Sequence, residues 1–128
     1  MTLYLVRHAK SSWENPDLSD FERPLNERGR RDAPRMGKRL KEREIVPDLM
    51  LSSPAKRAIT TCKEIASILS YDVSRIKTDR RIYHASEDEL LDILSKLNDT
   101  QKKVMIFGHN PAFTNLANTL FNEHIMNI

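Results

Sequence analysis

Cysteine, glycine and long apolar runs are all scarce in this chain of 128 residues, and each scarcity excludes a class of protein. The single cysteine, Cys62, rules out an internal disulfide and fits a reducing, cytoplasmic compartment. With three glycines in all, the chain has neither a P-loop nor a dinucleotide-binding fingerprint. No apolar run approaches the roughly 20 residues of a membrane span, and the N-terminal stretch 2–6 is also too short for a signal peptide. We therefore expect neither a membrane partner nor a cofactor.

The histidines are few and far apart, which argues against a metal site. No short ligand spacing joins any two of the four, which are His8, His84, His109 and His124. One cysteine cannot build a thiolate cage, and Cys62 falls on an apolar helical stripe, where a core position is more typical than a nucleophile. The sequence therefore predicts a protein without a metal.

The positive charge of the chain is concentrated in one segment. The net charge is +3, and residues 26–44 alone hold eight Arg or Lys and four Asp or Glu, an excess of +4. Apolar residues recur at helical spacing in this segment, which favours a solvated basic helix face. No aromatic stacking pattern or groove-reading motif accompanies the charge, so we do not expect nucleic acid as a partner. Attraction of an anionic substrate is the simpler explanation.

Strand-like and helix-like segments alternate along the chain. Apolar residues make up 39% of it and charged residues 30%, as in an ordinary globular domain. Strands are predicted at 2–6, 48–52, near Ile76 and at 104–107. Helices are predicted after Asn26, after Ser53-Pro54, after the capping box Ser86…Glu89 and after Asn110-Pro111. This alternation predicts an α/β fold, a three-layer α/β/α sandwich with a mostly parallel central sheet.

Two of these helices carry finer expectations. In the helix after Asn26, we expect Ala33, Met36, Gly37 and Leu40 on one helical face. In the next helix, Ser53 is the expected N-cap and Pro54 the first helical residue.

Charged and imidazole side chains follow three of the predicted strands. Arg7 and His8 come directly after the first strand, Arg57 lies just after the second, and Gly108-His109 follows the strand at 104–107. Ligands bind beyond the carboxyl ends of the strands in such sheets, so we expect these residues to converge there. Two guanidiniums suit phosphoryl oxygens, and two imidazoles supply a nucleophile and a hydrogen-bond donor. The pattern predicts phosphoryl transfer without a metal.

Three ordered motifs give the chain a family resemblance. Arg7-His8-Ala9, Ser53-Pro54-Ala55-Lys56-Arg57-Ala58 with Thr60-Thr61, and Gly108-His109-Asn110 resemble the signature of the histidine phosphatase superfamily. The segment Arg23-Pro24-Leu25 followed by Glu27-Arg28-Gly29 is similar to its phosphohistidine phosphatase (SixA-like) branch. The resemblance implies a phosphoglycerate mutase-like fold. It also implies one histidine phosphatase-like domain over 1–128, truncated or naturally short, because the chain stops where the family supplies a further strand.

The resemblance also implies roles for individual residues. His8 is then the nucleophile that becomes phosphohistidine, and Arg7, Arg57 and His109 form the phosphate pocket. Ser11 adds a hydroxyl contact, Gly108 lets the backbone approach a bound anion, and Trp13 either lines the pocket mouth or is structural. The general-acid glutamate of larger members is missing after the third strand, and His84 is the expected substitute.

Three functions remain open at this stage. A phosphohistidine leaving group needs no strong external acid, so the missing glutamate favours hydrolysis of phosphohistidine on a protein, a histidine phosphotransfer domain or a phosphocarrier. The alternative enzyme is a phosphatase or mutase acting on small phosphomonoesters such as sugar phosphates or phosphoglycerate. A phosphate-binding module without activity is the third reading, and the nucleophile His8 argues against it.

Overall fold

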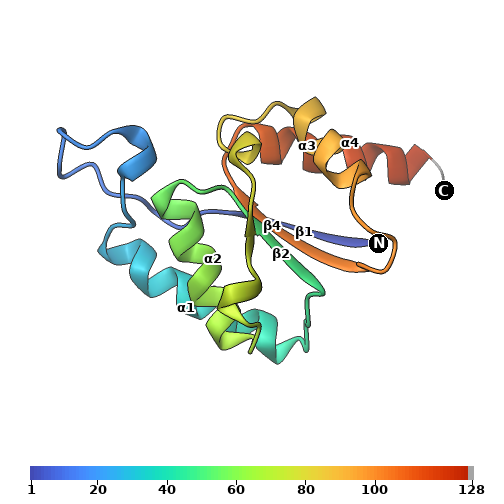
Figure 1. The fold of residues 1–128 in the computed structure, drawn as a ribbon, viewed down its shortest axis with the longest axis horizontal. Coiled ribbons are helices and arrows are strands. Elements are labelled where there is room, and N and C mark those ends of the chain that lie inside the picture. The colour runs from blue at the N-terminus through green and yellow to red at the C-terminus, as the bar shows by residue number, and fades with distance from the viewer. Residues whose placement is uncertain (127–128) are drawn as a thin grey trace.

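The predicted alternation of strands and helices is present in the computed structural model, which describes residues 1–126 (Figure 1). Within these residues the strands are β1 (Thr2–Arg7), β2 (Leu49–Ser52), β3 (Lys77–Thr78) and β4 (Lys103–Gly108). The α-helices are α1 (Glu27–Glu42), α2 (Lys56–Ile68), α3 (Glu87–Ser95) and α4 (Ala112–Met126). Short 3-10 helices also occur, namely η1 (Asp20–Glu22), η2 (Val73–Arg75) and η3 (Arg80–Ile82). The predicted absence of a further C-terminal strand lies outside the described residues and stays a prediction.

All the strand pairs of the sheet are parallel. The order is β1-β4-β2-β3, with β1 and β3 at the edges of the described sheet. Figure 1 shows α1 and α2 on one side of this sheet and α3 and α4 on the other. The structure therefore confirms the predicted α/β/α layering and the parallel central sheet.

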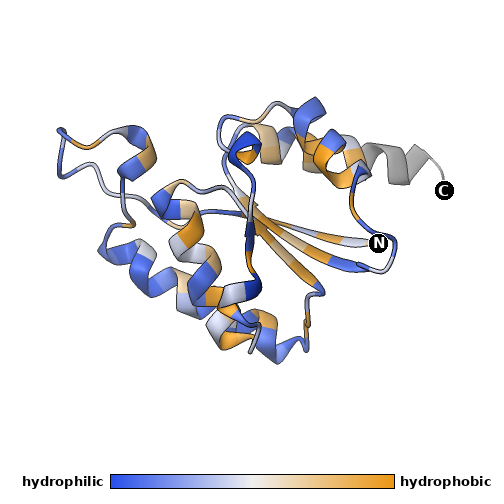
Figure 2. Ribbon diagram, viewed as in Figure 1, coloured by the Kyte–Doolittle hydropathy of each residue, from blue (hydrophilic) through white to orange (hydrophobic). Residues whose placement is uncertain are grey.

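Strand residues alternate between two hydrophobic cores, as the two-residue period of a strand requires. In β4, Val104 and Ile106 pack into the core beneath α3 and α4, whereas Met105 and Phe107 pack into the core beneath α2. All four side chains are fully buried, which explains why the strand reads as one apolar run. Figure 2 shows the apolar strands at the centre and hydrophilic residues on the outer surfaces of the helices.

Helix α1 begins as predicted and buries a stripe of small residues. The Asn26 side chain accepts a hydrogen bond from the backbone N of Gly29 at 2.8 Å, so Asn26 is the N-cap. Gly29, Ala33 and Gly37 are the buried residues of the helix. Met36 is 43% exposed and lines the cavity beside Ala33. The buried stripe of the helix is thus made of small residues at a four-residue spacing.

Helix α2 begins later than predicted. Its N-cap is Ala55, and Lys56 is the first helical residue. Ser53 still belongs to the sheet edge, since its backbone N donates to the carbonyl oxygen of Phe107 at 2.9 Å. The expectation that Ser53 caps the helix and Pro54 opens it was therefore wrong by two residues. By contrast, the capping box of α3 is confirmed, with Ser86 and Glu89 bonded to each other in both directions at 3.1 Å.

The close packing of α1 against the chain after β1 gives the first prediction. A Cβ on Gly29 would collide with the carbonyl oxygen of Lys10, which also accepts a hydrogen bond from the backbone N of Asn26 at 2.9 Å. A Cβ on Gly37 would meet only the side chain of Ile68, with Cδ1 at 3.0 Å and Cβ at 3.2 Å, so a small shift of that side chain is enough. We therefore expect Gly29→Ala to lower the free energy of unfolding by about 1–3 kcal/mol, the usual cost of overpacking. Thermal or urea unfolding measures this.

The matched control is Gly37→Ala, on the same helix. Alanine gains helix propensity of about 1 kcal/mol over glycine, so the free energy of unfolding should stay close to that of the parent protein. Equal stability of the two variants would contradict the close contact assigned to Gly29 and Lys10.

Candidate active site

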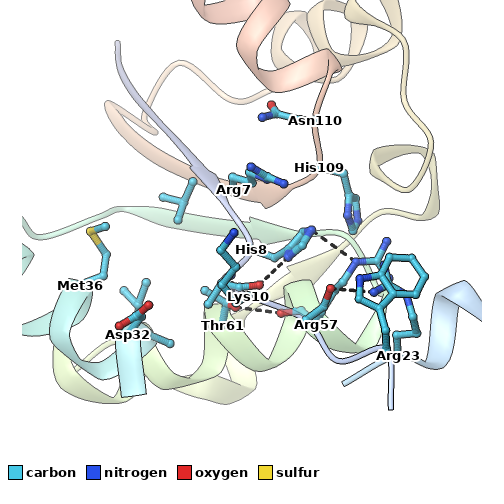
Figure 3. A pocket seen from close by; sticks show the side chains of 16 residues that line it. Arg7, His8, Lys10, Arg23, Asp32, Met36, Arg57, Thr61, His109 and Asn110 are labelled. Atoms are coloured by element: carbon cyan, nitrogen blue, oxygen red, sulfur yellow. Dashed lines mark hydrogen bonds between the residues drawn. The ribbon is translucent and has the colours of Figure 1, made fainter. Parts of the chain in front are cut away.

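The three predicted segments meet at one edge of the sheet. The strand register pairs Arg7 of β1 with Gly108 of β4, and Ser52 of β2 with Phe107 of β4. Beyond this edge, the backbone N of His8 donates to the carbonyl oxygen of Gly108 at 3.1 Å. A cavity of about 550 Å³ opens here, and Arg7, His8, Arg57 and His109 all line it (Figure 3). The predicted convergence at the carboxyl ends of the strands is present in the structure.

His8 is held as a neutral imidazole with one unprotonated nitrogen. Its Nδ1 lies 2.7 Å from the carbonyl oxygen of Ala9, and because a carbonyl only accepts, Nδ1 carries the proton. Nε2 therefore keeps its lone pair. Burial lowers the pKa of the His8 imidazole below its usual value, and the charges of Arg57 and Arg7 lower that pKa further. A neutral ring with Nε2 facing the cavity is the form that attacks phosphorus.

Thr61 fixes the backbone beside His8 to helix α2. Its hydroxyl donates to the carbonyl oxygen of Arg57 at 2.8 Å and accepts from the backbone N of Ala9 at 3.2 Å. The segment that carries the His8 ring is thereby fastened to the turn of α2 that carries Arg57.

Arg57 is buried and approaches His8 with one edge of its guanidinium. The residue is 5% exposed, and its Nε donates toward His8 Nε2 at 3.4 Å, the contact drawn in Figure 3. A phosphoryl group on Nε2 would therefore lie against a planar cationic donor, which suits its oxygens.

His109 faces His8 across the site. The two ring centroids are 5.2 Å apart, and His109 Nε2 lies 2.8 Å from the hydroxyl of Ser53. The Ser53 hydroxyl also accepts from the backbone N of Ala55 at 3.1 Å. His109 Nδ1 is buried and has no hydrogen-bond partner among the described residues. Burial lowers the pKa of His109 to about 4, so the ring is neutral at neutral pH.

Asp20 and Tyr83 belong to the site although nothing in the sequence singled them out. The Asp20 carboxylate accepts from Arg57 Nη2 at 2.9 Å, from Arg23 Nη2 at 3.0 Å and from the Tyr83 hydroxyl at 2.7 Å. The hydrogen bond from Tyr83, followed by those from the two arginines, holds the pKa of the Asp20 carboxyl well below its usual range. Asp20 stands among four acidic residues of the loop 9–25, so only its place three residues before Arg23 could have drawn attention to it.

The remaining predicted residues are placed as follows. Ser11 lines the cavity, and its hydroxyl accepts from Arg23 Nη1 at 2.8 Å. Trp13 lines the cavity too. It is 76% exposed, and the Arg23 guanidinium stacks 3.5 Å from its ring centroid, which favours a place at the pocket mouth over a structural role.

Gly108 and His84 lie outside the cavity lining. Gly108 is buried, and a Cβ there would strike Phe113 at 2.5 Å, so core packing requires this glycine. His84 is exposed, outside the cavity lining, and stacks on Tyr83 at 3.9 Å.

Other candidate chemistries find little support in the described part of the chain. Cys62 is fully buried, and burial raises the pKa of its thiol to about 12, so it is a core residue. Among the described side chains, no three His, Cys, Asp or Glu gather in a way that would hold a metal ion. Over the same residues, no helix has the length and apolar character needed to cross a membrane.

Comparison with known proteins identifies the family. The family model of the histidine phosphatase superfamily (branch 1) matches residues 3–82, and the chain therefore belongs to this superfamily. An uncharacterized chloroplastic protein of Arabidopsis thaliana is 30% identical over 131 residues, which are 96% of this chain and 60% of that protein. The 2,3-bisphosphoglycerate-dependent phosphoglycerate mutase of Bifidobacterium longum is 39% identical over 61 residues, 46% of this chain and 25% of the mutase. The chain thus spans less than two thirds of either curated relative, about 60% of the first and 25% of the second.

Solved structures agree with this assignment. A protein of Agrobacterium tumefaciens proposed to be the phosphohistidine phosphatase SixA is 32% identical, with a TM-score of 0.83 over 91% of this chain and 73% of that one. The protein histidine phosphatase SixA complexed with tungstate is 23% identical, with a TM-score of 0.82 over 91% of this chain and 74% of that one, and it shows the shared fold. The fold is phosphoglycerate mutase-like, as the sequence resemblance implied.

The environment of His8 predicts its titration. Since burial and nearby guanidiniums lower the pKa, the ring should stay neutral below pH 6.5, the ordinary value, and gain its proton only as pH falls through the lower folded-state pKa. Titration of the ring nitrogens by NMR measures this directly. The same histidine in the urea-unfolded chain is the reference, and a folded-state midpoint equal to or above that reference would contradict the assigned environment.

Proposed function

We propose that this protein is a metal-independent phosphohydrolase that removes phosphate from phosphohistidine on a protein through a phospho-His8 intermediate. The observation that carries the proposal is the neutral His8 ring, with its Nε2 lone pair beside Arg57 and its proton held at Ala9. A site that only binds phosphate has no use for a nucleophile so arranged. Membership of the histidine phosphatase superfamily supports the same chemistry.

The proposed reaction has two displacements at phosphorus. The lone pair of His8 Nε2 forms a bond to phosphorus while the bond from phosphorus to the substrate imidazole breaks. The leaving ring carries its own proton on its other nitrogen, so it departs as neutral imidazole. Water then attacks phospho-His8, gives its proton to the phosphate released, and restores the Nε2 lone pair. Arg7, Arg57 and His109 donate to the phosphoryl oxygens in both transition states.

The carboxyl groups near the site support a leaving group that needs no acid. The Asp20 carboxyl, with its lowered pKa, is ionised and held by arginines, so it has no proton to give. Asp32 lines the cavity at its α1 end and contacts Arg28 at 3.5 Å and Arg35 at 3.8 Å. An alkoxide leaving group would need a proton from such a residue, whereas a protonated phosphoimidazole does not. This favours phosphohistidine over phosphomonoesters.

His8→Ala tests the nucleophile and the substrate class together. Parent protein and variant are given a phosphohistidine-bearing phosphocarrier beside a panel of sugar phosphates and phosphoglycerate. We expect hydrolysis of the phosphohistidine, and acid-labile phosphate trapped on the parent protein only. The variant should lose both while keeping the unfolding temperature of the parent.

Two results would change the conclusion. Turnover retained in His8→Ala would overturn the covalent mechanism. A preference for a phosphomonoester would keep the mechanism and favour the alternative function, a phosphatase or mutase acting on small phosphomonoesters. The panel includes phosphoglycerate because part of the chain is similar to a phosphoglycerate mutase. In that case the role predicted for His84 as the acid can be checked with His84→Ala.

Arg57→Ala tests the cationic donor. Because one donor to the developing charge is lost, we expect kcat to fall roughly 10²–10³-fold, as when an oxyanion-hole donor is removed. Lys56→Ala is the matched control, since Lys56 is the neighbouring exposed cation in the first turn of α2. Equal losses in the two variants would mean that general positive charge matters, and would contradict a specific contact from Arg57.

A further inference from the structure

Asp20 gathers three side chains from separate parts of the fold. Arg57 comes from α2, Arg23 from the loop after η1, and Tyr83 from the residue following η3. Arg57 approaches Asp20 Oδ2 at 2.9 Å and the Asp20 carbonyl oxygen at 2.5 Å. Oδ2 also accepts from the Tyr83 hydroxyl at 2.7 Å, so this one residue ties the loop to both neighbouring segments.

The contacts of Arg57 divide its guanidinium into two edges. Nη1 and Nη2 are both occupied by Asp20, through the backbone oxygen and the carboxylate respectively. Each Nη atom keeps a second N–H, and the Nε N–H is directed at His8 Nε2. The phosphoryl group that would form on Nε2 thus meets the Nε edge, while the opposite edge is fixed. Asp20 lies on the far side of Arg57 and does not occupy the position of the phosphoryl group.

Arg23 is seated by the same carboxylate. Its Nε and Nη2 donate to Asp20 Oδ1 at 3.2 and 3.0 Å, and its Nη1 donates to Ser11 at 2.8 Å. The guanidinium also stacks on Trp13, and the residue is 8% exposed. Two arginines that would repel each other are therefore held at one site by a carboxylate between them, each on its own oxygen.

A fixed guanidinium matters for catalysis because an arginine side chain is otherwise flexible. Its long side chain has many rotamers, and a displacement of about 1 Å from the productive geometry can cost about 10²-fold in rate. Burial alone limits where Arg57 can go, but it does not decide which edge faces His8. The two contacts to Asp20 do decide this.

We propose that Asp20 is a positioning residue of the phosphoryl site. Asp20 holds both Nη atoms of Arg57, so that the Nε edge of Arg57 faces the phosphoryl group on His8. The same carboxylate holds Arg23 beside Arg57. This inference rests on the proposed function for its catalytic consequence. The contact geometry itself is independent of any substrate.

Asp20→Asn is the test variant, because an amide has the shape of the carboxylate but turns one acceptor oxygen into a donor that faces another donor. We expect kcat on the phosphohistidine substrate to fall about 10–100-fold with little change in unfolding temperature. The Ki for inorganic phosphate should not weaken, because a negative charge beside the anion has been removed. Asp17→Asn, an exposed position in the same loop, is the matched control and should behave as the parent protein.

A double-mutant cycle separates positioning from a general structural role. If Asp20 acts through Arg57, then Asp20→Asn should change the rate of Arg57→Ala less than about twofold, since interacting residues are not additive. The same fold-loss in both backgrounds would overturn the proposal, as would a parental rate in Asp20→Asn alone.

A measurement without substrate distinguishes failure of this inference from failure of the proposed function. The order parameter of the Arg57 Nε–H group, measured by ¹⁵N relaxation, should fall in Asp20→Asn and stay unchanged in Asp17→Asn. If the parent protein hydrolyses nothing, the proposed function fails and this measurement still decides whether Asp20 fixes Arg57. An unchanged order parameter in Asp20→Asn would overturn the positioning role even in an active enzyme.

Discussion

The parallel pairing of β1 with β4 and of β4 with β2 is the constraint on which the site depends. The register brings the carboxyl ends of all three strands to the same level, so the residues that follow them emerge side by side. Buried apolar side chains on both faces hold this register, because a shift of one residue would exchange the two cores. His8 and His109 face each other because the paired strands β1 and β4 end side by side.

Hydrogen bonds then orient the two imidazoles and the backbone beside them. Ala9 holds the proton of His8 away from the cavity, Ser53 engages His109, and Thr61 joins the His8 segment to α2. Each contact uses a hydroxyl or a backbone group, and none of them is an ion pair to either imidazole. Burial acts in the same direction on both rings.

The sequence predicts the residues of the strand ends better than those of the loop. Alternating apolar segments identify the strands, and parallel topology dictates that Arg7, His8 and His109 meet. The start of α2 escapes prediction because Ser53 has two possible partners, the helix N-terminus and the sheet edge, and tertiary contacts with Phe107 and His109 decide between them. Asp20 escapes prediction because an irregular loop has no periodicity, and a carboxylate that pairs with a residue 37 positions away leaves no local pattern.

The site consequently has two halves of different origin. The sheet edge supplies the nucleophile and its neighbours on rigid elements, whereas the loop 9–25 supplies Asp20, Arg23 and Trp13. This loop is closed at its base, where Ser11 bridges Leu25 and the backbone N of Ser12 donates to Pro24 at 2.8 Å. Because the two ends of the loop are already held together, less conformational entropy is lost when the middle of the loop contacts Arg57. The nucleophile thus lies at the sheet edge, while the carboxylate that contacts both Arg57 and Arg23 comes from the loop 9–25.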